Sequence, residues 1–198
     1  SFIKTFKERF EMTPKDWKNG GYREYSNKIL QQSQKAMESK ADFQNIVPTI
    51  VKMPAIESFY IRNKGYNVNI TETWQKLQTW VLTNNISSYK RIALFHDNPT
   101  ITPLNECQYI GCIMVEDKKS VKSDRLPNFK IAEGVYAKFD LKGKTGDVLP
   151  FIHWVYHEWL PKSEYETTTK PSYAIYHKLD FFDENNEFDL SFYVSINF

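Results

Sequence analysis

The chain is poor in cysteine and glycine, with 2 cysteines and 7 glycines among its 198 residues. Cys107 and Cys112 are five positions apart within one apolar run that predicts a β-strand. Side chains at an odd separation in a strand point to opposite faces, so these two thiols cannot pair with each other there. The sequence therefore excludes a disulfide framework. This fits a reducing compartment, and we expect a cytoplasmic protein.

Long apolar runs and a strong net charge are also missing. No stretch of about 18 apolar residues occurs and no signal peptide opens the sequence, so no membrane partner is expected. The net charge of +2 gives no overall electrostatic attraction for nucleic acid. Glycine-rich phosphate-binding loops are absent, and no cofactor is expected. Aromatic residues, in contrast, make up 16% of the chain, which suits a large core or an aromatic-lined cavity.

The first residues carry a helical pattern. Apolar residues recur at helical spacing over residues 1–10, and Thr13 and Pro14 suit the N-cap and first position of a second short helix. The run from Phe2 to Trp17, with its Phe-Lys-x-x-Phe-x-Met-Thr-Pro core, resembles the end of the DNA-binding domain of AraC-family transcription regulators. The resemblance implies that residues 1–18 are a remnant of a helix-turn-helix domain. DNA would then be bound only through the missing part of that domain.

The sequence starts inside this pattern without a methionine, so we expect a fragment of a longer protein. Residues 19–45 are polar with few apolar anchors, which predicts a linker that is helical around residues 24–40. From residue 46 the pattern alternates between strands and helices. Residues 46–198 are therefore predicted to form one α+β domain.

Two strands of the same design organise this domain. The run Phe188–Ile196 alternates strictly between apolar and polar residues, which indicates a half-buried strand, and Gln108–Val115 has the same design 81 positions earlier. Asn69 and Glu72 have the spacing of a capping box, which predicts the start of a helix. A second helix is predicted over residues 146–160. The other predicted strands are residues 46–53, 56–63, 91–96, 129–132, 135–141 and 173–179.

The two halves of the domain repeat one another. Equivalent residues keep a spacing of 78 or 81 positions, as in the pairs Gly65 and Gly143, Trp74 and Ile152, His96 and His177, and Val115 and Ile196. The pattern predicts two β-β-α-β-β copies related by a pseudo-two-fold axis. We expect an antiparallel sheet with two helices on one face and a ligand groove on the other, where the copies meet.

Three runs within this repeat resemble the GyrI-like small-molecule-binding domains. They are Arg-Ile-Ala-Leu-Phe-His-Asp-Asn-Pro-Thr-Ile-Thr-Pro at residues 91–103, Cys-Gln-Tyr-x-x-Cys-Ile at 107–113, and Glu-Trp-Leu-Pro-Lys-Ser-x-Tyr at 158–165. The resemblance covers residues 46–198 in the correct order. It implies a regulator in which an AraC-type DNA-binding domain precedes a module that binds a small-molecule effector. Other members of the superfamily bind drugs, inhibit gyrase or hydrolyse small electrophilic compounds.

If Ile113 and Ile196 face the helices, the alternate residues of both strands face the groove. The family often has an acidic residue at the positions of Ile110 and Ser191. Because both acids are missing here, the ligand is expected to be neutral or weakly polar rather than cationic. The predicted ligand-binding residues are Tyr60, Phe95, Ile110, Cys112, Tyr136, Trp154, Ser191 and Tyr193.

Metal and catalytic sites have weaker support. His153 and His157 are four positions apart on one predicted helix, but the His-Glu-x-x-His order and a third ligand are missing, so no metal site is predicted. No catalytic residue is assigned, and we expect a sensor rather than an enzyme. A small hydrolase that uses Tyr193 with Glu158 or Asp189 is one alternative. A protein-binding inhibitor is another, and a homodimer remains open.

Overall fold

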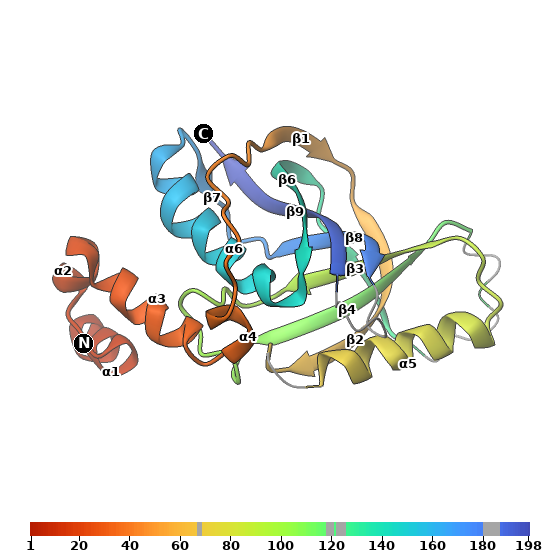
Figure 1. The fold of residues 1–198 in the computed structure, drawn as a ribbon, viewed down its shortest axis with the longest axis horizontal. Helices are drawn as coiled ribbons and strands as arrows, with labels where there is room; N and C mark the ends of the chain where they lie inside the picture. The colour runs from red at the N-terminus through yellow and green to blue at the C-terminus, as the bar shows by residue number, and fades with distance from the viewer. Residues whose placement is uncertain (67–68, 118–120, 122–125, 180–186) are drawn as a thin grey trace.

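The computed structural model describes residues 1–66, 69–117, 121, 126–179 and 187–198. They form a curled antiparallel sheet with helices packed on one face, and a helical N-terminal extension projects away from the sheet (Figure 1). No helix in these ranges is both long and apolar enough to cross a membrane.

The N-terminal extension is helical as the sequence predicts. The Asp16 amide donates to Thr13 Oγ1 at 3.2 Å, and the Asp16 carboxylate accepts from the Thr13 amide, so Thr13 and Pro14 hold the predicted capping positions. The elements are α1 (Phe2–Phe10), α2 (Pro14–Asp16), the kinked segment η1 (Trp17–Gly21), α3 (Tyr22–Leu30) and α4 (Gln34–Met37).

The predicted linker contains α3 and α4, which confirms its helicity. Ile29, Ala36 and Phe43 are buried, and the Phe43 ring lies 5.3 Å from that of Phe151 in the domain. Residues 22–43 therefore pack on the domain through apolar contacts. The boundary proposed at residue 46 stays a prediction.

The sheet contains all the predicted strands within about three residues at either end. Eight of the strands are hydrogen-bonded in the order β1-β6-β9-β8-β3-β4-β2-β5, and β7 pairs with β9 beside them. The strands are β1 (Thr49–Met53), β2 (Ile56–Lys64), β3 (Tyr89–Phe95), β4 (Gln108–Val115), β5 (Asn128–Ile131), β6 (Gly134–Lys144), β7 (Glu166–Thr167), β8 (Ser172–Leu179) and β9 (Glu187–Asn197).

This order confirms the duplication. The counterparts in the two repeats are β1 and β5, β2 and β6, β3 and β8, and β4 and β9. Exchanging every strand with its counterpart reverses the strand order, so a pseudo-two-fold axis passes between β3 and β8. At that centre Ala93 pairs with Ala174, 81 positions further on. The fold is the predicted α+β unit with a duplicated β-β-α-β-β layout.

The repeats also exchange their first strands. Only residues 54–55 separate β1 from β2, yet β1 pairs with β6 of the second repeat and β2 lies six places away in the sheet. Six strand spacings in a flat sheet would be about 29 Å, whereas a two-residue link spans about 10 Å. The sheet must therefore curl until its ends approach. Residues 132–133 join β5 to β6 in the equivalent way.

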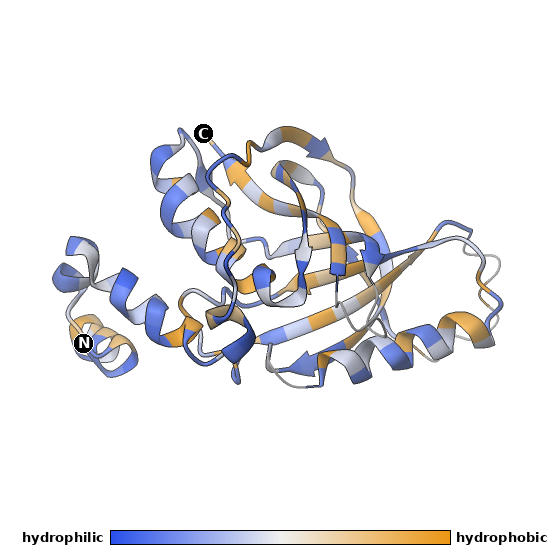
Figure 2. Cartoon of the chain, in the orientation of Figure 1, coloured by the Kyte–Doolittle hydropathy of each residue, from blue (hydrophilic) through white to orange (hydrophobic). Residues whose placement is uncertain are grey.

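Two helices cover one face of the sheet, as predicted. They are α5 (Ile70–Thr83) and α6 (Val148–Trp154); α6 begins after the 3-10 turn η3 (Thr145–Asp147) and continues into η4 (Val155–Trp159) and η5 (Leu160–Lys162). Trp74 and Leu77 of α5 and Phe151 of α6 pack with apolar strand residues in one core. In Figure 2 hydrophobic and hydrophilic residues alternate along α5, as expected for a helix that buries a single face.

The predicted capping box at the start of α5 is wrong. Asn69 has a φ of 59°, and its side chain makes no capping hydrogen bond. In this left-handed conformation the side chain does not take the usual N-cap position, which requires an extended backbone. The Asn69 carbonyl still accepts from the Thr73 amide at 3.0 Å, so the helix begins at the predicted place.

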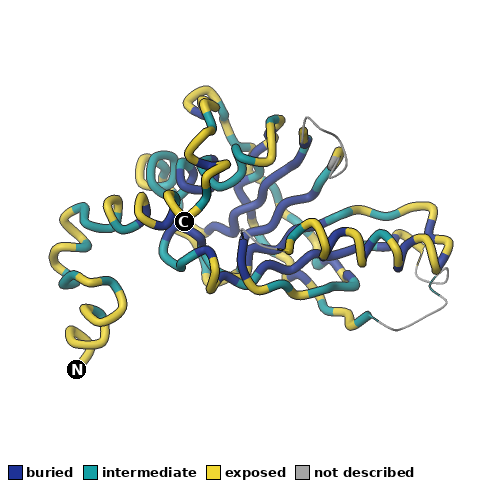
Figure 3. Tube along the Cα trace, turned by 60° about the horizontal axis from the view of Figure 1, so that its bottom comes forward, coloured by how far each residue is buried: buried dark blue, intermediate teal, exposed yellow. Residues whose placement is uncertain are grey.

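The second face of the sheet encloses a smaller core of its own. Its members include Ile92, Ile110, Cys112, Tyr136 and Tyr193, all nearly inaccessible to solvent. Buried strands run through the centre of the molecule (Figure 3), and the two cores lie on their two faces. Cys107 belongs to the helix-side core, on the opposite face from Cys112 as predicted, and both thiols are free.

We expect Gly111→Val to lower the free energy of unfolding by about 1–3 kcal/mol. A Cβ at Gly111 would lie 2.9 Å from Leu77 Cδ1 and 3.0 Å from Thr73 Cγ2, so the larger side chain would push α5 off β4. Urea unfolding followed by circular dichroism measures the change. At the control position Gly134 a Cβ would approach only the flexible end of Lys170 closely, and Gly134→Val should cost clearly less.

Candidate functional site

A cavity of about 480 Å³ lies on the helix-covered face between the first turns of α5 and α6. Equivalent residues of the two repeats line it on both sides. Ile70 and Val148 are 78 positions apart, and Phe95 and Tyr176 are 81 positions apart. This central cavity therefore lies where the two repeats meet, which is a common place for a ligand site.

Aromatic rings form the inner surface of the central cavity. Tyr66, Phe95 and Tyr109 contact one another edge to face, with ring centroids 5.5 to 6.0 Å apart. Tyr176 and Phe188 also line the cavity. All five residues come from the sheet or the turn after β2, so the rigid part of the fold positions them.

Hydrogen bonds hold the phenol groups in place. The Tyr66 hydroxyl donates to the Asp97 carbonyl at 2.6 Å, and Trp74 Nε1 donates to the Tyr109 hydroxyl at 2.9 Å. Burial raises the pKa of Tyr66, Tyr109 and Tyr176 above that of a free tyrosine. These phenols therefore remain neutral at physiological pH.

The central cavity offers little charge to a ligand. Among the described residues that line it, Lys35 is the only charged one. A cation entering the cavity would lose water without gaining a carboxylate partner, which is costly. The first-turn amides of α5 lack the Asn69 side-chain cap and suit a ligand with a hydrogen-bond acceptor. This chemistry favours a neutral aromatic molecule.

Residues 32–35, which precede the sheet, close one side of the central cavity. Gln32, Ser33, Gln34 and Lys35 line it, and the Leu104 amide donates to Gln32 Oε1 at 2.9 Å. These residues precede the two β-β-α-β-β copies in the sequence. The cavity is thus built from both repeats and from the chain that leads into them.

The eight residues predicted to bind the ligand do not lie together. Phe95 lines the central cavity, and Trp154 lines a separate cavity of about 510 Å³ together with Glu158 and Trp159. The other six lie on the second face and line neither of these cavities: Tyr60, Ile110, Cys112, Tyr136, Ser191 and Tyr193. Their role in ligand binding stays a prediction.

The second-face residues have structural partners. Ser191 donates to Asp140 Oδ1 at 2.6 Å and lies 2.8 Å from His177 Nε2, which ties β6, β9 and β8 together. Its only proton is therefore directed at a carboxylate. Burial raises the pKa of the Cys112 thiol to about 12, so this thiol is not an activated nucleophile.

The histidine pair joins α3 to the domain. His157 Nε2 lies 2.8 Å from Ser26 Oγ, and Ser26 donates to the Thr100 carbonyl. His153 packs against the His157 ring, with centroids 5.8 Å apart. Glu158 interacts with Lys162 at 3.0 Å and with Arg23 of α3 at 3.7 Å. Within the described ranges no three His, Cys, Asp or Glu side chains gather in a way that could hold a metal ion.

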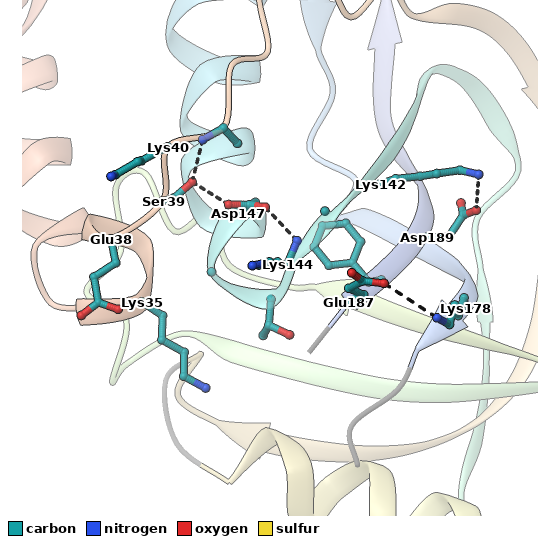
Figure 4. A pocket seen from close by; sticks show the side chains of 15 residues that line it. Lys35, Glu38, Ser39, Lys40, Lys142, Lys144, Asp147, Lys178, Glu187 and Asp189 are labelled. Atoms are coloured by element: carbon teal, nitrogen blue, oxygen red, sulfur yellow. Dashed lines mark hydrogen bonds and ion pairs between the residues drawn. The ribbon is translucent and has the colours of Figure 1, made fainter. Parts of the chain in front are cut away.

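A larger pocket of about 1040 Å³ is open and charged (Figure 4). Two of its ion pairs are Lys142 with Asp189 at 3.1 Å and Lys178 with Glu187 at 4.0 Å. Lysines and acidic residues line it, whereas five aromatic residues line the less open central cavity. The smaller central cavity is therefore the better candidate site.

Sequence reasoning missed most residues of the central cavity. Tyr66, Tyr109, Tyr176 and Phe188 were absent from the predicted set, which took its groove from the other face. One available signal was the repeat spacing, because Tyr176 follows Phe95, which was in the predicted set, by 81 positions. The contribution of Gln32–Lys35 had no such signal.

These features define a duplicated α+β ligand-binding domain. The chain belongs to the GyrI-like small-molecule-binding domain family, whose model matches residues 47–196. This confirms the GyrI-like resemblance. No match was found among proteins of curated function.

Solved structures share the fold at low sequence identity. A DNA complex of EcmrR gives a TM-score of 0.61 at 11% identity, covering 88% of this chain and 66% of that one. The EcmrR C-terminal domain gives 0.56 at 13% identity, covering 78% and 99%. A hydrolase from Listeria innocua gives 0.54 at 11% identity, covering 76% and 92%. At these identities the similarity establishes the fold alone.

We expect protonation of His153 to destabilise the fold at acidic pH. Burial lowers its pKa to about 4, whereas the pKa in the unfolded chain is about 6.5. Between these values the unfolded state binds a proton that the folded state does not. The free energy of unfolding therefore falls as the pH drops through this range, by up to about 3 kcal/mol, and the contribution is complete above about pH 6.5.

Urea unfolding of the wild type and of His153→Gln, at several pH values between about 7 and 4, measures this contribution. The variant should lose less stability than the wild type over the range. Equal losses would show that other groups cause the acid sensitivity.

Proposed function

We propose that this chain is the ligand-sensing part of an AraC-type transcription regulator. Its effector is a neutral or weakly polar aromatic molecule bound in the central cavity. The observation that carries this proposal is the aromatic cavity at the junction of the repeats, with no acidic residue among its described lining residues. The description of the family as small-molecule binding supports the same conclusion.

The regulatory part of the proposal rests on the N-terminal residues. The run from Phe2 to Trp17 resembles the end of an AraC-type DNA-binding domain, and Thr13 and Pro14 begin a helix as that resemblance implies. The similarity of the fold to EcmrR, which was solved in a complex with DNA, supports the assignment to a regulator. DNA binding itself would belong to the full-length protein.

The neutral dye 1-aminoanthracene tests the binding site. We expect it to bind with enhanced fluorescence and at least about tenfold more tightly than proflavine, a cation with three fused rings of similar size, because the cavity lacks a carboxylate. Fluorescence titration measures both affinities. A stronger affinity for proflavine would contradict the proposed ligand class, and failure of the wild type to bind any neutral aromatic probe would contradict the sensor.

Leu149→Trp should weaken 1-aminoanthracene binding by at least about tenfold, because the larger side chain fills the central cavity. Leu82→Trp is the matched control, since Leu82 lies on the exposed side of α5 with 67% of its surface accessible. The control should bind like the wild type. Equal affinity of the two variants would place the dye elsewhere.

We propose further that the chain is not an enzyme, although one structural neighbour is a hydrolase. Tyr193 lies on the second face and its ring stacks on that of Tyr173, with the ring centroids 4.7 Å apart. Burial raises the pKa of Tyr193. Glu158, on η4, and Asp189 both interact with lysines. We expect no hydrolysis of p-nitrophenyl acetate or styrene oxide above the buffer rate. Turnover that disappears in Tyr193→Phe would instead support the hydrolase.

A further inference from the structure

The segment that leads into the domain contributes to each of the three cavities described above. We refer to residues 32–46 as the connector. Residues 32–35 line the central cavity, and residues 35 and 38–41 line the charged pocket. Gln44 and Ile46 line the cavity of about 510 Å³ beside Trp154. The family match begins only at residue 47. The connector therefore shapes the cavities from outside the matched domain.

The connector makes a close backbone contact with η3, the turn that precedes α6. A Cβ added at Gly146 would lie 2.5 Å from the Lys35 carbonyl oxygen. Only glycine allows this approach, because the carbonyl belongs to the main chain and cannot rotate away as a side chain would. Gly146 itself lines the central cavity beside Lys35.

Hydrogen bonds fix the connector on either side of this contact. Ser39 Oγ donates to Asp147 Oδ1 at 2.6 Å (Figure 4), and Gln32 Oε1 accepts from the Leu104 amide at 2.9 Å. Ala36, between them, is 4% exposed. The connector thus has a defined docked position with polar and apolar contacts.

We infer that Gln32–Lys35 form part of the ligand site, so that ligand binding and docking of the connector stabilise each other. The inference rests on the proposed function of the central cavity. A ligand that touches these residues binds the docked state more tightly than the undocked state, and linkage makes the effect reciprocal. The ligand would then contact the segment that joins the domain to residues 1–18.

Contacts of α3 continue this connection toward the N-terminus. Arg23 interacts with Glu158, and Ser26 lies 2.8 Å from His157 Nε2. Both partners belong to the helix that begins beside Gly146. A shift of α3 would therefore act on the same helical segment that contributes a wall of the central cavity.

Variants of the full chain test this inference, with 1-aminoanthracene as the probe. Gly146→Ala should displace Lys35, raise amide hydrogen exchange over residues 32–42, and weaken probe binding by about tenfold. Gly134→Ala is the matched control, because its Cβ closely approaches only the flexible end of Lys170. It should change neither measurement.

Ser39→Ala separates docking from direct contact with the probe. Ser39 does not line the central cavity. Its variant loses the hydrogen bonds of Ser39 Oγ with Asp147 and with the Ala41 amide, so it should weaken binding by up to about fivefold through the docking of the connector. In the wild type the probe should slow exchange over residues 32–42. These three results together would support the composite site.

Two outcomes would overturn the inference in different ways. If the wild type binds the probe but both variants bind it equally well and exchange in the connector does not change, the composite site is wrong and the sensor proposal stands. If the wild type binds no neutral aromatic probe, the sensor proposal falls and the composite site falls with it.

Discussion

The pairing of β3 with β8 is the interaction on which the rest of the structure depends. Five residue pairs join these strands, and together with the exchanged pairs β1–β6 and β2–β5 they make one sheet from two repeats. Ala93 and Ala174 meet at its centre, and both are fully buried. The same register sets Phe95 and Tyr176 on either side of the pseudo-two-fold axis. This pair of aromatic rings in the central cavity thus follows from the duplication.

Strand identity and sidedness could be predicted because they depend on local patterns. The alternation in β9 placed Phe192 and Ile196 in the helix-side core, and the structure confirms this. The repeat spacing predicted the pseudo-symmetry, because equivalent side chains occupy equivalent environments. The capping hydrogen bond predicted for Asn69 is missing because it does not depend on the local pattern alone. Spacing identifies residues that are able to cap a helix, but the backbone angle at Asn69 is set by its surroundings.

The candidate site was less predictable because it depends on how elements pack. The predicted set contains Phe95 but not Tyr109, because the groove was expected on the face of Ile110 and Cys112. Alternation shows that Tyr109 and Ile110 face opposite ways but does not show which of them lines the central cavity. The contribution of Gln32 depends on a contact with Leu104 that lies 72 positions away. No local pattern records such a contact.

The two repeats depend on each other because they exchange β1 and β5. Each half supplies the outer strand that covers the other half's otherwise open edge. Detached from its twin, either half would present unpaired backbone groups along that edge and invite association with other chains. Neither repeat is therefore expected to be stable without the other, and a mutation that disrupts one repeat also disrupts the other.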